Sequence, residues 1–192
     1  MLQHPIFEDT SVPWAIDMDG TLIREDVTEL AINLSMLNPL MWHTFMYALL
    51  VWLFQTETHA HRYLEIRFPP DPKKLTYNNT LINRIETHRK EGGHVILATA
   101  SHYLAATPVA KHVDLFDAVL GSDPPLIMDA KADEKARLLS IRFPKGFVYA
   151  GNSKDDIKVW NCEACKAMML VNCKPEVLEM ARQIQKPYIV IQ

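Results

Sequence analysis

Two aspartates, Asp17 and Asp19, follow an apolar run and lead into a Gly-Thr turn. Alternate residues of a strand point to opposite sides, so the two carboxylates should face different parts of one site. Aspartate is a poor strand residue, and an unpaired buried carboxylate is costly, so both acids need a chemical reason. Phosphoryl transfer to a metal-bound carboxylate is a chemistry that uses such a pair.

Apolar runs predict six strands, at residues 13–18, 94–99, 117–121, 147–150, 167–172 and 188–191. Helical patterns separate the later runs, at residues 103–112, 131–142, 155–163 and 175–185. This alternation predicts a doubly wound α/β domain with a parallel sheet of right-handed βαβ units. Ligands of such sheets bind beyond the carboxyl ends of the strands, where Asp17, Thr99 and Gly151-Asn152 are expected to converge.

The stretch between the first and second strands, residues 24–92, is far longer than a usual βα connection and has a helical pattern. We therefore expect a small helical cap, inserted after the first strand at about residues 24–80. Residues 1–23 and 81–192 would form the α/β core. The proline-rich segment at residues 69–72 marks the expected return to this core.

The predicted cap contains a long uncharged segment. Residues 31–56 include no Asp, Glu, Lys or Arg, and residues 40–54 are almost wholly apolar. A packed cap helix or a homodimer surface is the first interpretation, and a helix lying in a membrane surface is the second. A membrane span is disfavoured, because spanning helices need roughly 20 apolar residues and polar residues interrupt the wider run.

The composition limits the classes of partner and compartment. A chain of 192 residues with 48% hydrophobic side chains can bury a sizeable core. Its net charge of −3 provides no general basic field, so nucleic acid is not an expected partner. Three clustered cysteines and an N-terminus without signal-peptide features favour the cytoplasm, with a peripheral position on the inner face of the membrane as an alternative.

Two other motifs have ordinary interpretations. Cys162 and Cys165 have the spacing of a zinc or redox pair, but they lie in a helical pattern without a second pair or a neighbouring histidine. Buried thiols are the better interpretation. His59 and His61 diverge on a predicted helix, which favours a solvated face over a metal site.

Separated segments resemble the motifs of the haloacid dehalogenase (HAD) superfamily. Motif I is D-x-D-G-T followed by a hydrophobic residue, and residues 17–22 match it. Motif II is a strand that ends in a residue with a side-chain hydroxyl. The resemblance assigns this role to Thr99, with Ser101 as the alternative. The layout is similar to that of phosphoserine phosphatase, in which a small helical cap follows the first strand.

The resemblance continues through the second half of the chain. Motif III is a lysine at the start of a helix, and Lys135 fits its spacing better than Lys131. Motif IV has the form G-D-x-x-x-D, but here Asn152 replaces the first acid and Asp156 takes the second position. Mg²⁺ accepts carbonyl oxygens as well as carboxylates, so Asn152 can coordinate it with one fewer negative charge at the site.

These motifs imply an Mg²⁺-dependent HAD-type phosphatase. Asp17 would attack a phosphomonoester and form an aspartyl-phosphate, while Asp19 would protonate the leaving oxygen and then activate water. Thr99 and Lys135 would stabilise the transferring phosphoryl group. The metal ligands implied by the resemblance are Asp17, Asp19, Asn152 and Asp156.

Substrate contacts are expected within and just after motifs I and II, from Met18, Gly20, Arg24, Asp26, Ala100, Ser101 and His102. Arg24 and Asp26 have an alternative interpretation as a solvated pair or a helix N-cap, and His102 as the cap of the next helix. The uncharged cap segment favours a substrate with an apolar part. The expected substrate is therefore a phosphorylated small molecule or a prenyl or lipid phosphate.

A narrower resemblance covers residues 14–173, including the runs LATAS and YAGNS. These residues resemble the HAD-like domain found ahead of UbiA-type aromatic prenyltransferase domains, in which G-N-S is the usual form of motif IV. The resemblance implies an alternative function, a weakly catalytic or non-catalytic module. Such a module would bind a phosphorylated lipid, a membrane surface or a prenyltransferase partner through residues 31–56. No prenyltransferase domain follows, so we expect a freestanding relative or an excised domain.

Overall fold

The strands of the described chain form one parallel sheet in the order β3-β2-β1-β4-β5-β6. The computed structural model describes residues 4–37, 39–122 and 131–192. The strands are β1 (Trp14–Ile16), β2 (Val95–His102), β3 (Ala118–Ser122), β4 (Phe147–Gly151), β5 (Cys165–Val171) and β6 (Tyr188–Ile191). The predicted doubly wound parallel α/β fold is confirmed.

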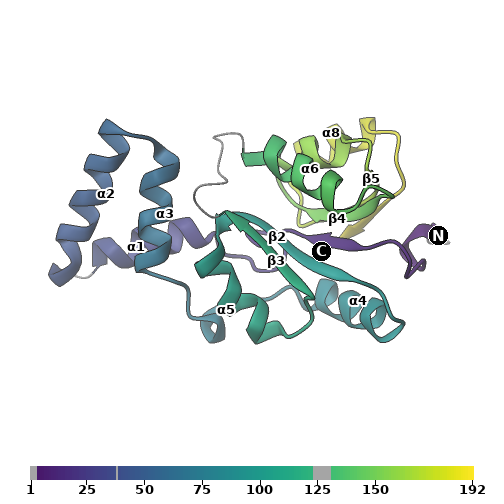
Figure 1. Ribbon diagram of the computed structural model, residues 1–192, viewed down its shortest axis with the longest axis horizontal. Helices are drawn as coiled ribbons and strands as arrows, with labels where there is room; N and C mark the ends of the chain where they lie inside the picture. The colour runs from purple at the N-terminus through teal and green to yellow at the C-terminus, as the bar shows by residue number, and fades with distance from the viewer. Residues whose placement is uncertain (1–3, 38, 123–130) are drawn as a thin grey trace.

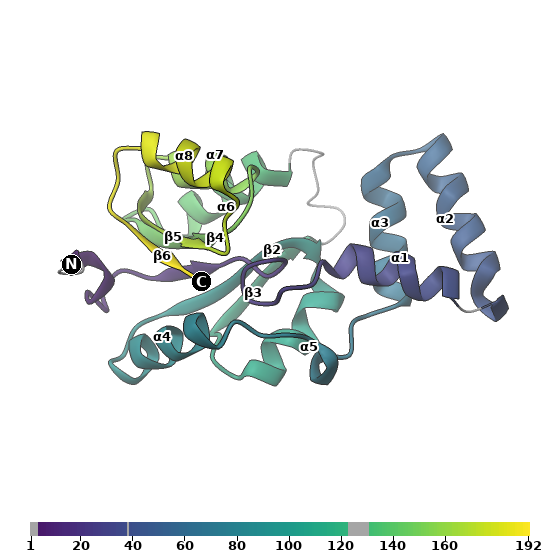
Figure 2. The same cartoon turned by 180° about the vertical axis from the view of Figure 1, so that it is seen from behind.

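Helices cover both faces of the sheet (Figures 1 and 2). One face packs against α4 (Asn79–Lys90) and α5 (Tyr103–Val113), and the other against α6 (Lys131–Arg142), α7 (Asp156–Asn161) and α8 (Pro175–Gln183). Alternate residues of β1 serve the two layers: Trp14 and Ile16 belong to the α4/α5 cluster, whereas Ala15 belongs to the α6/α7/α8 cluster. Burial on both faces explains why the strands are almost continuously apolar.

β1 lies at the centre of the sheet, between β2 and β4. The strand order reverses at this position, which is where doubly wound sheets bind their ligands. Asp17 directly follows β1 and therefore lies at the carboxyl edge beside the ends of β2 and β4. β2 is longer than predicted, because it continues past Thr99 to His102 with a register irregularity after Ala98.

A separate helical layer lies between β1 and β2 in the sequence (Figure 1). We call residues 27–67 the helical insertion; it comprises α1 (Val27–Leu37), η2 (Pro39–Met41), α2 (Trp42–Phe54) and α3 (Glu57–Arg67). Short 3-10 turns also occur at Pro5–Phe7 (η1) and Pro72–Lys74 (η3). The helices of the insertion fall within the predicted range of 24–80, and the chain returns to the sheet through α4.

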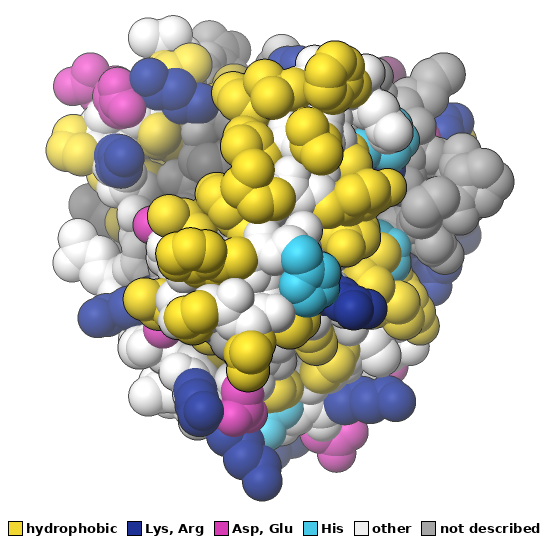
Figure 3. Space-filling model, turned by 90° about the vertical axis from the view of Figure 1, so that its left-hand side faces the viewer, with side chains coloured by type: hydrophobic (Ala, Val, Ile, Leu, Met, Phe, Trp, Pro, Cys, Tyr) yellow, Lys and Arg dark blue, Asp and Glu magenta, His cyan; other side chains and the backbone are white. Residues whose placement is uncertain are grey.

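The insertion has a small apolar core of its own, in which Ala31, Ala48 and Leu64 are buried. α2 buries the small residues Thr44, Ala48 and Val51, while most of its large apolar side chains face outward. Figure 3 shows apolar side chains gathered over this end of the molecule. Among the described residues, no single helix is long and apolar enough to cross a membrane; α1 and the segment Pro39–Phe54 meet that test only as a bent pair.

His88 of α4 packs its imidazole against β1, beneath the helix. It is 2% exposed and stacks on Trp14, with ring centroids 4.0 Å apart. Burial, with a smaller effect from Arg89, lowers the pKa of His88 to about 4 from its ordinary value of 6.5. The unfolded chain therefore binds a proton between these pH values that the folded chain does not, so this group makes the protein less stable as the pH falls from 6.5 towards 4.

We expect the free energy of unfolding to decrease by about 2 kcal/mol more in the wild type than in His88→Leu between pH 7 and pH 4.5. Urea denaturation at both pH values measures this difference. Equal pH dependence in the two proteins would show that His88 does not remain neutral in the folded state.

Candidate active site

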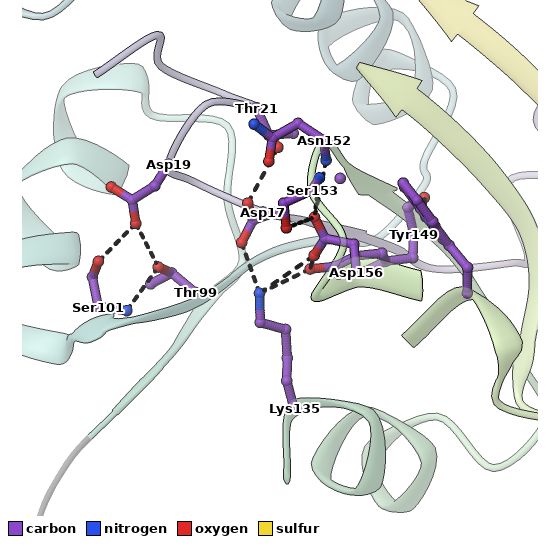
Figure 4. A network of polar contacts seen from close by, with 12 residues as sticks. Asp17, Asp19, Thr21, Thr99, Ser101, Lys135, Tyr149, Asn152, Ser153 and Asp156 are labelled. Atoms are coloured by element: carbon purple, nitrogen blue, oxygen red, sulfur yellow. Dashed lines mark hydrogen bonds and ion pairs between the residues drawn. The ribbon is translucent and has the colours of Figure 1, made fainter. Parts of the chain in front are cut away.

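The carboxylate of Asp17 is buried at the carboxyl end of β1 and has a donor on each oxygen (Figure 4). Its Oδ1 accepts a hydrogen bond from Lys135 Nζ at 2.7 Å, and its Oδ2 accepts one from Thr21 Oγ1 at 3.2 Å. The backbone N–H of Asp17 donates to the Ala150 carbonyl at 3.0 Å. The side chain is therefore held between the turn after β1 and the start of α6.

Asp19 contacts a different set of residues. Its Oδ2 accepts hydrogen bonds from Ser101 Oγ at 2.7 Å and Thr99 Oγ1 at 3.2 Å, both from β2. Its Oδ1 accepts the backbone N–H of Val27 at 2.9 Å, at the start of α1. Asp17 thus faces α6, whereas Asp19 joins β2 to the helical insertion. This arrangement agrees with the expectation that alternating carboxylates serve different parts of one site.

Lys135 is the buried cation of this network. Besides Asp17, its Nζ donates to the Tyr149 hydroxyl at 2.9 Å and lies 3.8 Å from Asp156 Oδ1. The Tyr149 hydroxyl in turn donates to Asp156 Oδ1 at 2.8 Å. Lys135 therefore connects the end of β1 to β4 and α7 through one chain of hydrogen bonds.

Asp156 organises the loop that contains Asn152. Its Oδ2 accepts hydrogen bonds from the backbone N–H groups of Asn152 and Ser153, both at 2.9 Å, and from Ser153 Oγ at 3.0 Å. With the Tyr149 hydroxyl, the carboxylate accepts four hydrogen bonds from nearby residues. This geometry favours Asp156 as the group that positions the loop, with Asn152 projecting its amide.

Gly20 allows Asn152 to approach the turn after β1. The φ of Gly20 is +71°, and a Cβ built there would lie 2.0 Å from Asn152 Nδ2. Only glycine combines this left-handed conformation with so close a neighbour. Because Gly20 has no side chain, the amide of Asn152 can pack against the segment that contains Asp17 and Asp19.

The site has more buried negative than positive charge. Burial raises the pKa of Asp17 to about 7 despite the opposing effect of Lys135, and burial also raises the pKa of Asp19. Burial and hydrogen bonding to Asp156 raise the pKa of Tyr149 as well. Lys135 forms ion pairs with Asp17 and Asp156, and a further cation would stabilise the ionised forms of Asp17 and Asp19.

The oxygen donors at this site fit a hard divalent ion. Asp17, Asn152 and Asp156 line the same cavity and offer carboxylate and amide oxygens. Asp19 follows Asp17 by two residues, and its main-chain carbonyl is a further oxygen donor. Within the part of the chain that the structure describes, acids, histidines and cysteines alone do not form a metal-binding group of three or more. A magnesium site here would therefore depend on the amide of Asn152 or on main-chain oxygen.

These groups line a cavity of about 410 Å³ between the sheet and the helical insertion. The core contributes Asp17, Asp19, Gly20, Ala100, Ser101, Lys135, Asn152 and Asp156 to its wall. The insertion and the segment before it contribute Arg24, Asp26, Thr28, Thr58, His61, Arg62 and Glu65. Acidic, basic and hydroxyl side chains thus face one space large enough for a small phosphate ester.

Three of the predicted site residues do not line this cavity. Thr99 lies behind it, where its hydroxyl donates to Asp19, while Ser101 reaches the cavity wall. The Met18 side chain is fully buried in the apolar core. The imidazole of His102 is buried and accepts the Leu104 backbone N–H at 3.1 Å, which is the helix-capping alternative, so the geometry does not support substrate contact by this side chain.

Arg24 and Asp26 do line the cavity. Asp26 also accepts the backbone N–H of Glu29 at 2.9 Å, which is the interaction of a helix N-cap. Ala100 lies on the same wall, beside Ser101. The side chain of Lys131, the alternative to Lys135 in the sequence, lies outside the described residues.

The sequence interpretation missed several functional candidates. Tyr149 precedes the Gly151-Asn152 turn by two residues, and that alternation could have placed it on the same face of β4 as the site. Arg62 and Glu65 belong to α3, and no local sequence pattern marks them as site residues. The backbone N–H of His102 donates to Glu65 Oε2 at 2.6 Å, and Thr28 donates to Glu65 Oε1. Burial raises the pKa of Glu65.

We expect Gly20→Ala to lower the free energy of unfolding by about 2–3 kcal/mol, because the new Cβ combines a strained φ with a collision against Asn152. Gly92→Ala is the matched control, since Gly92 has a φ of +92° and nothing within 4 Å of its Cβ position. It should lose only about 1 kcal/mol. Urea denaturation measures both, and equal losses would contradict close packing of Asn152 on Gly20.

Comparisons of the whole fold identify related structures. A protein of unknown function from Bordetella pertussis Tohama I superposes with a TM-score of 0.66 at 15% identity, covering 94% of this chain and 97% of that one. A substrate-bound phosphoserine phosphatase superposes with a TM-score of 0.59 at 11% identity, covering 94% and 92%. At these identities, the likeness establishes the fold.

Sequence comparison gives a relative and a family. The uncharacterized protein y4nM of Sinorhizobium fredii (strain NBRC 101917 / NGR234) is 28% identical over 164 residues, which are 85% of this chain and 30% of that protein. The chain therefore spans about a third of the length of this relative. The family model for haloacid dehalogenase-like hydrolases matches residues 15–160, from β1 through α7. The chain belongs to the haloacid dehalogenase-like hydrolase family.

Proposed function

We propose that this protein is an Mg²⁺-dependent phosphomonoester hydrolase that acts through an aspartyl-phosphate on Asp17. The observation that carries the proposal is the 2.7 Å contact between Lys135 Nζ and Asp17 Oδ1 on the wall of the polar cavity. An ammonium group beside this carboxylate favours its ionised, nucleophilic form. The same ammonium would offset charge on a phosphoryl group bound there.

Asp17 and Asp19 would divide the chemistry. An oxygen of Asp17 attacks phosphorus, the bond to the ester oxygen breaks, and Asp19 gives its proton to the leaving oxygen. Asp19 then takes a proton from water, which attacks the phosphorus, releases inorganic phosphate and regenerates Asp17. Burial raises the pKa of Asp19, which supports its role as the proton donor.

Other groups of the cavity would bind and orient the phosphoryl group. Ser101 lines the cavity, and Thr99 supports it by accepting the Ser101 backbone N–H at 3.0 Å. Asp17, Asn152 and the Asp19 carbonyl would hold Mg²⁺, with Asp156 acting directly or by positioning the loop. When bound, Mg²⁺ supplies positive charge that neutralises the phosphoryl oxygens.

The substrate in this proposal is a small phosphate ester or a prenyl or lipid phosphate. Phosphoserine phosphatase is among the structural neighbours, and one of its structures contains a phospho-aspartyl intermediate analogue. Arg24, Asp26 and Gly20 line the cavity and are proposed as substrate contacts. The uncharged segment at residues 31–56 supports the prenyl or lipid alternative.

We expect Asp17→Asn to reduce phosphate release at least about a thousandfold, because the amide cannot form the covalent intermediate. The assay measures inorganic phosphate from phosphoserine, p-nitrophenyl phosphate and prenyl phosphates, with Mg²⁺ and with EDTA. Asp114→Asn is the matched control, since Asp114 is exposed at the C-cap of α5 in a left-handed conformation that asparagine tolerates. No Mg²⁺-dependent release from any substrate would refute the enzymatic proposal.

A second candidate function is membrane binding by a weakly catalytic or non-catalytic HAD module. The outward apolar side chains of the helical insertion favour it: Leu40 is 85% exposed, Phe54 82% and Leu37 79%. Large exposed apolar patches of this kind mark interaction surfaces. Trp42, which is 58% exposed at the start of α2, is a residue type typical of membrane interfaces. A prenyltransferase partner and a homodimer are the alternative occupants of this surface.

If this face binds bilayers, the double change Trp42→Ser with Phe54→Ser should weaken co-sedimentation with phospholipid vesicles at least about tenfold, because each side chain loses apolar burial. Ile141→Ser is the matched control, since Ile141 is 64% exposed on α6, outside the insertion. Equal vesicle binding by both variants would show that this surface is not the membrane-binding one. Analytical ultracentrifugation without vesicles would reveal a homodimer instead.

A further inference from the structure

A second hollow lies inside the helical insertion, between α1, α2 and α3. Its volume is about 200 Å³, and its walls are the apolar side chains of Ile32, Phe45, Leu49, Trp52 and Leu64. Ala48 and Ala60, both buried, complete the lining and keep the hollow open because their side chains are small. We call this space the insertion groove.

The insertion groove meets the active-site cavity at His61, which lines both spaces. α3 presents a different side to each of the two spaces. Thr58, His61, Arg62 and Glu65 recur at helical spacing along the side that faces the cavity. The residues Ala60 and Leu64, one turn apart, form the side that faces the groove. A polar space that holds Asp17 and Asp19 thus adjoins an apolar one, and the two share His61.

We propose that the insertion groove binds the apolar chain of the substrate, a phosphate monoester with a linear alkyl or isoprenoid tail. This inference rests on the proposed function, which places the phosphoryl group beside Asp17. Apart from the imidazole of His61, the described lining of the groove is apolar, so a sugar or amino-acid group would lose hydrogen bonds with water there. An apolar chain would gain free energy by leaving water.

The geometry also selects a chain over a compact group. The groove has about half the volume of the active-site cavity, and its lining includes both His61 and Trp52, which is 52% exposed. A ligand that occupied both spaces would lie beside His61, the residue that they share. A flexible hydrocarbon chain can fit this arrangement, with its phosphate in the polar cavity and its far end beside the Trp52 indole.

Two leucines on α2 provide a matched pair of variants. Leu49 lines the groove, whereas Leu53, one turn along, is 61% exposed on the outer surface. Leu49→Ser should remove apolar contact from the chain, while Leu53→Ser makes the same chemical change outside the groove. Ala60→Leu tests the volume independently, because the larger side chain would fill the space.

Binding is measured without turnover by using Asp17→Asn protein and alkylphosphonates from methyl to octyl, below their micelle-forming concentrations. Isothermal titration calorimetry gives the affinity, and the part of the tryptophan fluorescence change that Trp52→Phe removes reports occupancy of the groove. Affinity should increase about fourfold for each added methylene until the groove is full, since each buried methylene contributes about 0.8 kcal/mol. Leu49→Ser and Ala60→Leu should remove most of this increase, and Leu53→Ser should retain it.

Equal affinity for short and long phosphonates would overturn the inference, as would equal losses in Leu49→Ser and Leu53→Ser. The latter result, combined with competition by phospholipid vesicles, would assign the apolar contacts to the outer surface. The experiments distinguish failure of the groove proposal from failure of the phosphatase proposal. Chain-length-dependent binding without phosphate release would refute only the enzyme, whereas release from all phosphates regardless of chain length would refute only the groove.

Discussion

The architecture of the site depends on one buried ion pair, between Lys135 Nζ and Asp17 Oδ1 at 2.7 Å. Both side chains are about nine-tenths buried, so neither charge is well solvated by water. Breaking such a pair by removing one partner leaves an uncompensated buried charge, which is strongly destabilising. Hydrogen bonds from Lys135 to Tyr149 and from Tyr149 to Asp156 extend the same network to the Asn152 loop. One lysine therefore orients the nucleophilic candidate and the loop that would hold the metal.

Asp19 and Glu65 connect this core to the helical insertion. Asp19 accepts hydrogen bonds from β2 and from the first turn of α1. Glu65 of α3 accepts the His102 backbone N–H and the Thr28 hydroxyl, so it joins β2, α1 and α3. Both carboxylates lie on the cavity wall. The contacts that hold the insertion in place are thus made by residues that also line the cavity.

The helical insertion departs from the usual distribution of apolar residues. Its small apolar core buries Ala31, Ala48 and Leu64, and most of its other large apolar side chains line the insertion groove or face outward. This distribution supports the idea that an apolar ligand or surface completes the insertion, with the groove suited to a single chain and the outer face to a larger partner.

The strand and helix pattern determined the doubly wound sheet, because burial on both faces requires continuous apolar strands that alternate with amphipathic helices. Motif spacing identified Asp17, Asp19, Lys135 and Asn152, which short turns deliver to one edge of the sheet. The tertiary structure decided that Ser101 lines the cavity while Thr99 supports Asp19 from behind, since β2 continues beyond its predicted end. It also brought in Tyr149 and Glu65. Their contacts join segments 14–37 residues apart in the chain, and no local pattern of residue types records which distant side chains will meet.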